Sequence, residues 1–238
     1  ENIHKVIDPL FLDELKAEFE EIRNIAVKRT RERKLQDFQK KLSTLTFLDP
    51  ACGSGNFLTE TYLSLRRLEN EILQELQGGQ MVLGYDNMNP IQVSISQFYG
   101  IEINDFAVTV AKTALWIAES QMMKETESIV LMHLDFLPLK TNAFIHEGNA
   151  LQVDWESVIP KYQLSYIMGN PPFVARAGRT KAKDSSSKGM LDDTQKTDRL
   201  NVFGEDLGNV DYVACWFKKA AVFTKNTAIR CAFVATDS

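Results

Sequence analysis

Cysteine is scarce in this chain of 238 residues, and the three cysteines are Cys52, Cys215 and Cys231. Their odd number and wide separation argue against a disulfide framework and favour a reducing compartment. Histidine is equally rare, with three residues whose spacing is not typical of a metal site. We therefore expect neither a disulfide-stapled fold nor a metal centre.

Long apolar segments are also missing. No apolar run approaches the roughly 20 residues that a membrane span requires, and the opening segment ENIHKVIDPL lacks the basic and then apolar order of a signal peptide. The net charge of −5 argues against a chain that coats nucleic acid by bulk charge, although it allows a local basic patch. These absences predict a globular cytoplasmic protein without a membrane partner.

Short segments of strand character alternate with longer segments of helical periodicity. Strands are expected at 45–49, 96–103, 143–151, 163–168 and 228–236, and helices at about 11–42 (with room for one break), 57–76, 105–122 and 211–223. The polar segment 175–198 is expected to be a loop. The alternation predicts an α/β fold with a doubly wound, mostly parallel sheet. We divide it into an N-terminal helical segment, 1–44, and a core, 45–238.

The first predicted helix contains the strongly basic stretch RNIAVKRTRERKLQDFQKK at 23–41. Two interpretations stay open. The charges form a solvated helix face, or they contact an anionic polymer backbone.

The segment FLDPACGSGNFL joins the first strand to the next helix. Gly53 and Gly55 allow a sharp turn and close approach of a ligand, and the helix that follows offers free N–H groups. The segment lacks the Gly-Lys-Ser/Thr of a phosphate-binding P-loop. Leu58 stands where a dinucleotide-binding turn has its third glycine. The pattern indicates a nucleoside-type ligand without a pyrophosphate.

Four polar residues fall at the carboxyl ends of predicted strands, where open α/β sheets bind ligands: Asp49, Glu102, Asn149 and Asn170. Asp49, placed before the glycines, disfavours a pyrophosphate and favours a cationic ligand. Glu102 can accept hydrogen bonds from both hydroxyls of a ribose. A nucleoside with an amino-acid tail and a sulfonium fits this set, and that ligand is S-adenosylmethionine.

Two motifs carry a family resemblance. DPACGSGNF at 49–57 resembles the cofactor motif of the amino-group DNA methyltransferases, and NPPF at 170–173 resembles their catalytic motif. The text around them, at 47–73 and 98–122, resembles the MmeI-like (Type IIL) restriction–modification enzymes, and the resemblance covers nearly the whole chain. It implies a class I methyltransferase (Rossmann-like) fold and S-adenosylmethionine-dependent methylation of adenine N6 in double-stranded DNA. The first twelve residues resemble the stretch that helps to seat the cofactor in that group.

The resemblance also implies roles for individual residues. Asp49 and the backbone of 51–55 hold the methionine part of the cofactor, Glu102 holds the ribose, and Ile103 packs on the adenine. Asn149 stands where the family often has an aspartate that reaches the adenine, and an amide can both donate and accept there. The cofactor-binding candidates are Asp49, Ala51, Cys52, Gly53, Gly55, Glu102, Ile103 and Asn149.

The catalytic candidates are Asn170, Pro171, Pro172 and Phe173. The Asn170 side-chain oxygen and the Pro171 carbonyl can accept the two hydrogens of an exocyclic amine, and the prolines preorganise them. Phe173 can stack on a base that has left the duplex. Cys52 lies in the cofactor turn, so it is expected to pack rather than to attack the base.

The segment after the catalytic motif is basic, with DNA-contact candidates Arg176, Arg179, Lys181 and Lys183. They can contact phosphates, or they can belong to a solvated loop. The resemblance implies a C-terminal target-recognition domain and allows an N-terminal nuclease domain, neither of which falls within this chain. Two alternatives remain open. The substrate is a protein glutamine or an RNA guanine amine, or the chain only binds the cofactor and is inactive alone.

Overall fold

The sheet is a parallel α/β arrangement. The computed structural model describes residues 2–77, 90–131, 134, 142–173, 191–204 and 210–235. Within these residues five parallel strands lie in the order β3-β2-β1-β4-β5. They are β1 (Phe47–Asp49), β2 (Phe98–Glu102), β3 (Phe144–Glu147), β4 (Tyr166–Gly169) and β5 (Arg230–Phe233). The strand order reverses between β1 and β4, which confirms the predicted doubly wound sheet.

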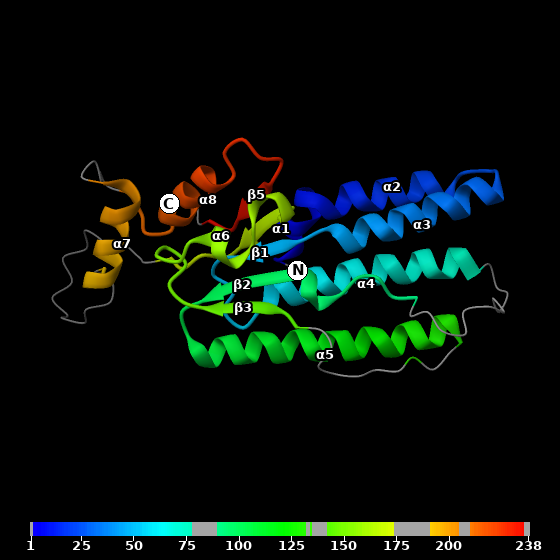
Figure 1. Cartoon of the computed structure of the whole chain (residues 1–238), viewed down its shortest axis with the longest axis horizontal. Coiled ribbons are helices and arrows are strands. Elements are labelled where there is room, and N and C mark those ends of the chain that lie inside the picture. Colours follow the sequence, from blue (N-terminus) through cyan, green and yellow to red (C-terminus); the bar gives the residue numbers. More distant parts are fainter. Residues whose placement is uncertain are drawn as a thin grey trace.

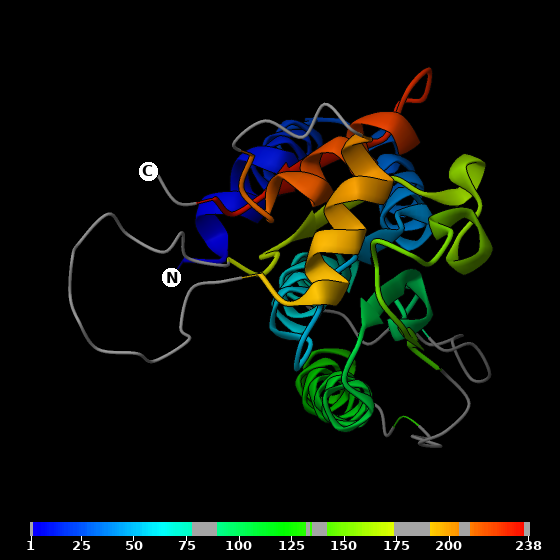
Figure 2. The same cartoon turned by 90° about the vertical axis from the view of Figure 1, so that its left-hand side faces the viewer.

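Helices cover both faces of this sheet (Figure 1). They are α1 (His4–Ile7), the π-helical η1 (Asp8–Leu12), α2 (Asp13–Arg23), α3 (Lys28–Thr44), α4 (Asn56–Gln77), η2 (Ile95–Gln97), α5 (Asp105–Val130), α6 (Trp155–Val158), η3 (Lys161–Gln163), α7 (Asp193–Phe203) and α8 (Ala214–Phe223). Successive residues of a strand point to opposite faces, so Phe47 joins the core under α4 and α5 while Leu48 joins the core under α8. Figure 2 shows α4 and α5 on one side of the sheet and α8 on the other.

The long helix expected at 11–42 is a helical hairpin. Its break falls between α2 and α3, and the rings of Phe19 and Phe38 stack across the pair at 6.3 Å. The helix expected at 105–122 continues to Val130 because Thr126 and Val130 are buried. The sequence offers Asn104 or Asp105 as the cap of this helix, and the structure selects Asn104, whose side chain accepts a hydrogen bond from the Ala107 N–H at 3.0 Å.

The loop prediction for 175–198 was wrong at its C-terminal end, where α7 begins at Asp193. The Asp192 side chain accepts the Gln195 N–H at 2.7 Å, and the Gln195 side chain accepts the Asp192 N–H at 3.1 Å. This reciprocal capping box starts a helix inside a polar segment. The candidates Arg176, Arg179, Lys181 and Lys183 lie outside the described residues.

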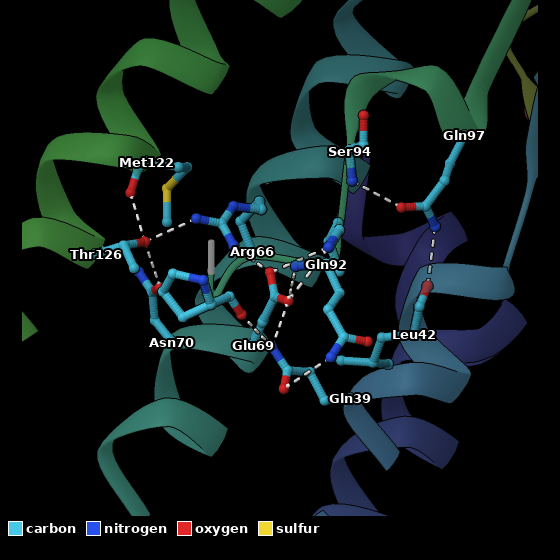
Figure 3. Close-up of polar contacts among 12 residues, drawn as sticks. Gln39, Leu42, Arg66, Glu69, Asn70, Gln92, Ser94, Gln97, Met122 and Thr126 are labelled. Atoms are coloured by element: carbon cyan, nitrogen blue, oxygen red, sulfur yellow. Dashed lines mark hydrogen bonds and ion pairs between the residues drawn. The ribbon is translucent and has the colours of Figure 1, made fainter. Parts of the chain in front are cut away.

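A buried polar network fixes α4 against α3 and α5 (Figure 3). Arg66 and Glu69 form an ion pair on α4 with 1% and 0% of their side chains exposed. Glu69 also accepts from the Gln39 side chain at 2.8 Å and from the Gln92 N–H at 2.6 Å, and Arg66 donates to the Thr126 hydroxyl at 2.7 Å. Because both charges have partners, the network holds the helices in register without an uncompensated buried charge. Across the described residues, no helix is both long and apolar enough to cross a membrane.

Candidate active site

A cleft of about 470 Å³ lies at the carboxyl edge of the sheet. Six of the predicted site residues line it: Ala51, Glu102, Ile103, Asn149, Asn170 and Pro172. They come from the ends of β1, β2, β3 and β4, and α7 and the start of α8 complete the wall. Figure 2 looks onto this edge, with α7 in front of the strands. The cleft therefore brings candidates for the cofactor and for catalysis into one space.

A larger hollow, of about 590 Å³, lies at the other edge of the sheet, beside the start of β4 and β5. Tyr162, Ser165 and Arg230 are among its lining residues, and none of the predicted site residues is. Ligands of open α/β sheets bind at the carboxyl ends of the strands, so the smaller cleft is the candidate site.

The glycine turn after β1 is anchored to its neighbours. The Cys52 N–H donates to the Ile101 carbonyl of β2 at 3.1 Å, and the Gly55 N–H donates to the Cys52 carbonyl at 2.8 Å. Gly55 has a φ of +81°, and a Cβ there would lie 3.0 Å from the Cβ of Ala111 on α5. Glycine is therefore required where the turn enters α4 against α5.

Glu102 is positioned by the backbone on both sides. One carboxylate oxygen accepts from the Gly53 N–H at 2.9 Å and the other from the Asn104 N–H at 2.9 Å. A carboxylate has about four acceptor positions, so both oxygens can accept further hydrogen bonds from hydroxyls in the cleft. Ile103 follows with 66% of its surface exposed and can cover the face of a flat ring.

Asp49 is the most deeply buried carboxylate of the predicted set, with 1% exposed. One of its oxygens accepts the Ala51 N–H at 3.0 Å. Burial raises the pKa of Asp49 to about 7, the Ala51 hydrogen bond opposes the rise, and the charge of Glu102 adds to it. A cation bound next to Asp49 would restore the ionised form, which fits the expected cationic ligand.

Cys52 does not have the environment of a nucleophile. The residue is buried. Burial, followed by the negative charges of Asp49 and Glu102, raises the pKa of its thiol. A raised pKa keeps the sulfur protonated and unreactive. The structure thus supports packing as the role of Cys52.

The Asn-Pro-Pro-Phe segment leaves the sheet directly after β4. Asn170 is exposed and lines the cleft with Pro172, while Pro171 is buried. Phe173 is 39% exposed and is not among the residues that line the cleft. Asp49, Cys52, Gly53, Gly55 and Pro171 are also outside the lining and form the turn and strand end behind it.

Sequence reasoning missed Asp198, a carboxylate on α7 that lines the cleft with only 1% exposed. Asp198 accepts hydrogen bonds from the Asn149 amide at 2.8 Å, the Gln152 amide at 2.9 Å and the Tyr212 hydroxyl at 2.9 Å. Burial and the hydrogen bond to Asp198 raise the pKa of Tyr212. The Asp-x-x-Gln capping pattern at 192–195 was the available indication that a helix, rather than a loop, carries Asp198.

Two residues of α8 were missed as well. The Trp216 indole N–H donates to the Pro50 carbonyl at 3.0 Å, which connects α8 to the glycine turn. The Lys219 ammonium donates to three carbonyls of the loop after β3, those of Ala150, Leu151 and Val153. Helix α8 therefore supports the two loops that form one side of the cleft.

The arrangement has counterparts among known proteins. The family model described as "MmeI, DNA-methyltransferase domain" matches residues 25–238. The chain belongs to this MmeI methyltransferase domain family. The Type IIL restriction-modification enzyme MmeI, solved in complex with DNA, is similar at 43% identity and a TM-score of 0.82, over 98% of this chain and 29% of that one.

Curated relatives point in the same direction. DNA methyltransferase A of Bacillus subtilis is 39% identical over 242 residues, which covers 100% of this chain and 25% of the relative. A putative type II restriction enzyme and methyltransferase of Methanocaldococcus jannaschii is 26% identical over 57% of this chain. The chain thus spans about a quarter of the length of DNA methyltransferase A. Its fold and its family resemblance agree with those expected from the sequence.

Proposed function

We propose that this chain is the catalytic core of a restriction–modification DNA methyltransferase that methylates the exocyclic amine of adenine. The observation that carries the proposal is the shared cleft, where Asn170 and Pro172 of the amine-binding motif lie with Glu102, Ile103 and Asn149. DNA as the substrate is supported by family membership and by the DNA methyltransferases among the relatives.

S-adenosylmethionine is the cofactor that these residues fit. Asp49 is a buried carboxylate behind the cleft whose pKa burial raises to about 7, and a cation bound nearby would favour its ionised form. Glu102, held by two backbone N–H groups, accepts from ribose hydroxyls, and the exposed Ile103 covers the adenine. When bound, the cofactor supplies an electrophilic methyl group on a sulfonium. The chain's own part is to orient it and to exclude water.

The Asn-Pro-Pro-Phe segment binds the amine that receives the methyl group. The Asn170 side-chain oxygen and the Pro171 carbonyl accept its two hydrogens and favour a more tetrahedral nitrogen, whose lone pair is then available. The proline rings fix the backbone before the substrate arrives, so the acceptors are preorganised. Phe173 offers a partly exposed ring on which a base taken out of the duplex can stack.

We propose that base choice along DNA belongs to other parts of the polypeptide. The chain covers 25% of the length of DNA methyltransferase A of Bacillus subtilis, which leaves room for such parts. We propose that a target-recognition domain follows the core and that a nuclease domain can precede it. The division into a helical segment, 1–44, and a core, 45–238, is part of this proposal. The basic residues Arg176, Arg179, Lys181 and Lys183 are proposed to contact the DNA backbone next to the catalytic motif.

The proposal is tested with the full-length protein, labelled S-adenosylmethionine and duplex DNA. After digestion of the DNA to nucleosides, mass spectrometry should find the label in N6-methyladenine. Label in N4-methylcytosine would contradict adenine as the base. Label in release factor or ribosomal RNA, with unlabelled DNA, would replace DNA as the substrate.

A further inference from the structure

Asp198 is a buried carboxylate that accepts hydrogen bonds from three neutral side chains in the part of the chain that the structure describes. Asn149, Gln152 and Tyr212 donate to it at 2.8–2.9 Å, so three of its roughly four acceptor positions are used. Burying a carboxylate costs free energy unless hydrogen bonds compensate. A carboxylate kept at 1% exposure beside the cleft therefore has a role beyond solubility.

The contact with Asn149 has a directional consequence. The Asn149 nitrogen donates to Asp198 at 2.8 Å, and the Asn149 oxygen accepts the Leu151 N–H at 2.9 Å. A flipped amide would turn its oxygen toward the carboxylate, where it has no hydrogen to give. Asp198 and the Leu151 N–H thus fix which end of the Asn149 amide is the nitrogen, and one amide hydrogen is left for a ligand.

Helix α7 contributes to the cleft in two places. Asp192, Thr194 and Gln195 of its first turn line the cleft, and so does Asp198 one turn later. The side chains of Asp192 and Gln195 each accept the backbone N–H of the other residue in the capping box, so their hydrogen bonds stabilise the start of the helix. Asp198 connects α7 to Asn149, one of the residues expected to bind the cofactor, because it accepts the hydrogen bond of the Asn149 amide. Both residues line the cleft.

We propose that Asp198 is a positioning residue that acts through Asn149 and sets the selectivity of the cleft for the adenine of the cofactor. This inference rests on the proposed function, since it requires a nucleoside in the cleft. With its orientation fixed, the Asn149 amide offers an N–H donor, which matches an acceptor nitrogen such as N1 of adenine. Hypoxanthine carries a hydrogen on N1, so the same amide opposes it.

The wild-type protein gives a test that needs no variant. Isothermal titration calorimetry should show S-inosylhomocysteine binding at least about tenfold more weakly than S-adenosylhomocysteine, because one hydrogen bond to a buried group is lost. Equal affinity for the two ligands would overturn the inference. Failure to bind either ligand would overturn the proposed function itself, which is a different outcome.

Variants then test whether Asp198 orients the Asn149 amide or only stabilises the fold. Asp198→Asn removes the charge and allows the Asn149 amide to turn over, so it should weaken S-adenosylhomocysteine binding about tenfold and lower the preference over S-inosylhomocysteine. Asn149→Ala should do the same. The double variant should bind no more weakly than the weaker single variant, because both substitutions remove the same hydrogen bond, the one from the Asn149 amide to the ligand.

Gln152→Ala is the matched control, since Gln152 donates to the same carboxylate but is not among the residues that line the cleft. Its ligand affinity and selectivity should stay close to the wild-type values. Melting temperatures measured for all variants identify any loss of folding. Additive effects of Asn149→Ala and Asp198→Asn, or a loss in Gln152→Ala equal to that in Asp198→Asn, would reduce Asp198 to a structural residue and overturn the inference.

Discussion

Gly169 lies directly against the carboxylate of Asp49, and a Cβ at Gly169 would stand 2.4 Å from the Asp49 Oδ1. Asp49 ends β1 and Gly169 ends β4, the two strands between which the strand order reverses. Asn170 is the next residue of the chain. The absence of a side chain at Gly169 therefore lets the strand that carries the amine-binding motif pack against the buried acid of the cofactor turn.

The first prediction concerns this contact. Gly169→Ala should destabilise the protein by about 1–3 kcal/mol, because the new methyl group overlaps the Asp49 carboxylate. Urea denaturation measures the free energy of unfolding. The control is Gly169→Ala in an Asp49→Ala background: the part of the cost that comes from the overlap should disappear there, and the part that comes from the φ of +158° at Gly169 should remain. Wild-type stability in Gly169→Ala would contradict the close packing.

A second prediction follows from the pKa of Asp49, which is about 7 in the folded protein and 3.8 in an unperturbed group. Between these values the folded state binds more protons than the unfolded state, so the contribution of Asp49 to stability falls as pH rises from about 4 to about 7. Asp49→Asn should remove this part of the pH dependence. Denaturation at pH 5, 6, 7 and 8 compares the two proteins.

The same pKa affects ligand binding. A cation beside Asp49 favours the ionised carboxylate, so S-adenosylmethionine binding should release a proton near pH 6 and strengthen toward pH 8. Calorimetry in buffers of different ionisation enthalpy measures the proton release. Asp49→Asn should show weaker binding without proton release. An unchanged proton release in Asp49→Asn would assign the effect to another group.

Much of the fold could be predicted because the deciding features are local. The glycine turn after Asp49 and the Asn104 cap are short patterns with a direct physical cause, and both are confirmed in the structure. The sites that depend on several elements could not be predicted. Asp198 lies in a polar stretch that suggests a solvated loop, and its burial comes from Asn149 and Tyr212, which are 49 and 14 residues away in the chain.

The end of α5 shows the same limit. Periodicity indicated a helix to about residue 122, since the residues beyond it are mostly polar. Thr126 is nevertheless fully buried, and a hydrogen bond from Arg66 of α4 satisfies its hydroxyl there. A buried arginine is rarely expected from sequence alone, and the contact that extends the helix requires both helices in place.

A further prediction concerns the Arg66–Glu69 network. Glu69→Gln should lower the free energy of unfolding by about 3–5 kcal/mol, because it leaves the Arg66 charge buried without its partner. Arg67→Met is the control, since Arg67 is about half exposed and its ion pair with Glu60 spans 3.5 Å. That change should cost no more than about 1 kcal/mol. Equal costs for the two variants would contradict the role of the buried pair.

The next prediction concerns the reactivity of the cysteines. Cys52→Ala should retain methyl transfer within a few-fold, because the thiol is buried and its pKa is raised. Burial raises the pKa of the Cys231 thiol as well, but its side chain is accessible to the reagent. Alkylation of the native protein by iodoacetamide at pH 8, followed by peptide mass spectrometry, should therefore modify Cys231 before the buried Cys52 and Cys215. A covalent adduct between Cys52 and DNA would contradict the direct transfer described above.

The most direct test of the account is methyl transfer by the full-length protein carrying Asn170→Ala. Because Asn170 is proposed to accept a hydrogen of the target amine, its loss should slow transfer of labelled methyl to adenine N6 in duplex DNA by about 100-fold or more. Calorimetric affinity for S-adenosylhomocysteine should remain close to the wild-type value. Transfer at the wild-type rate in Asn170→Ala would contradict the central claim that this cleft binds the amine and methylates it.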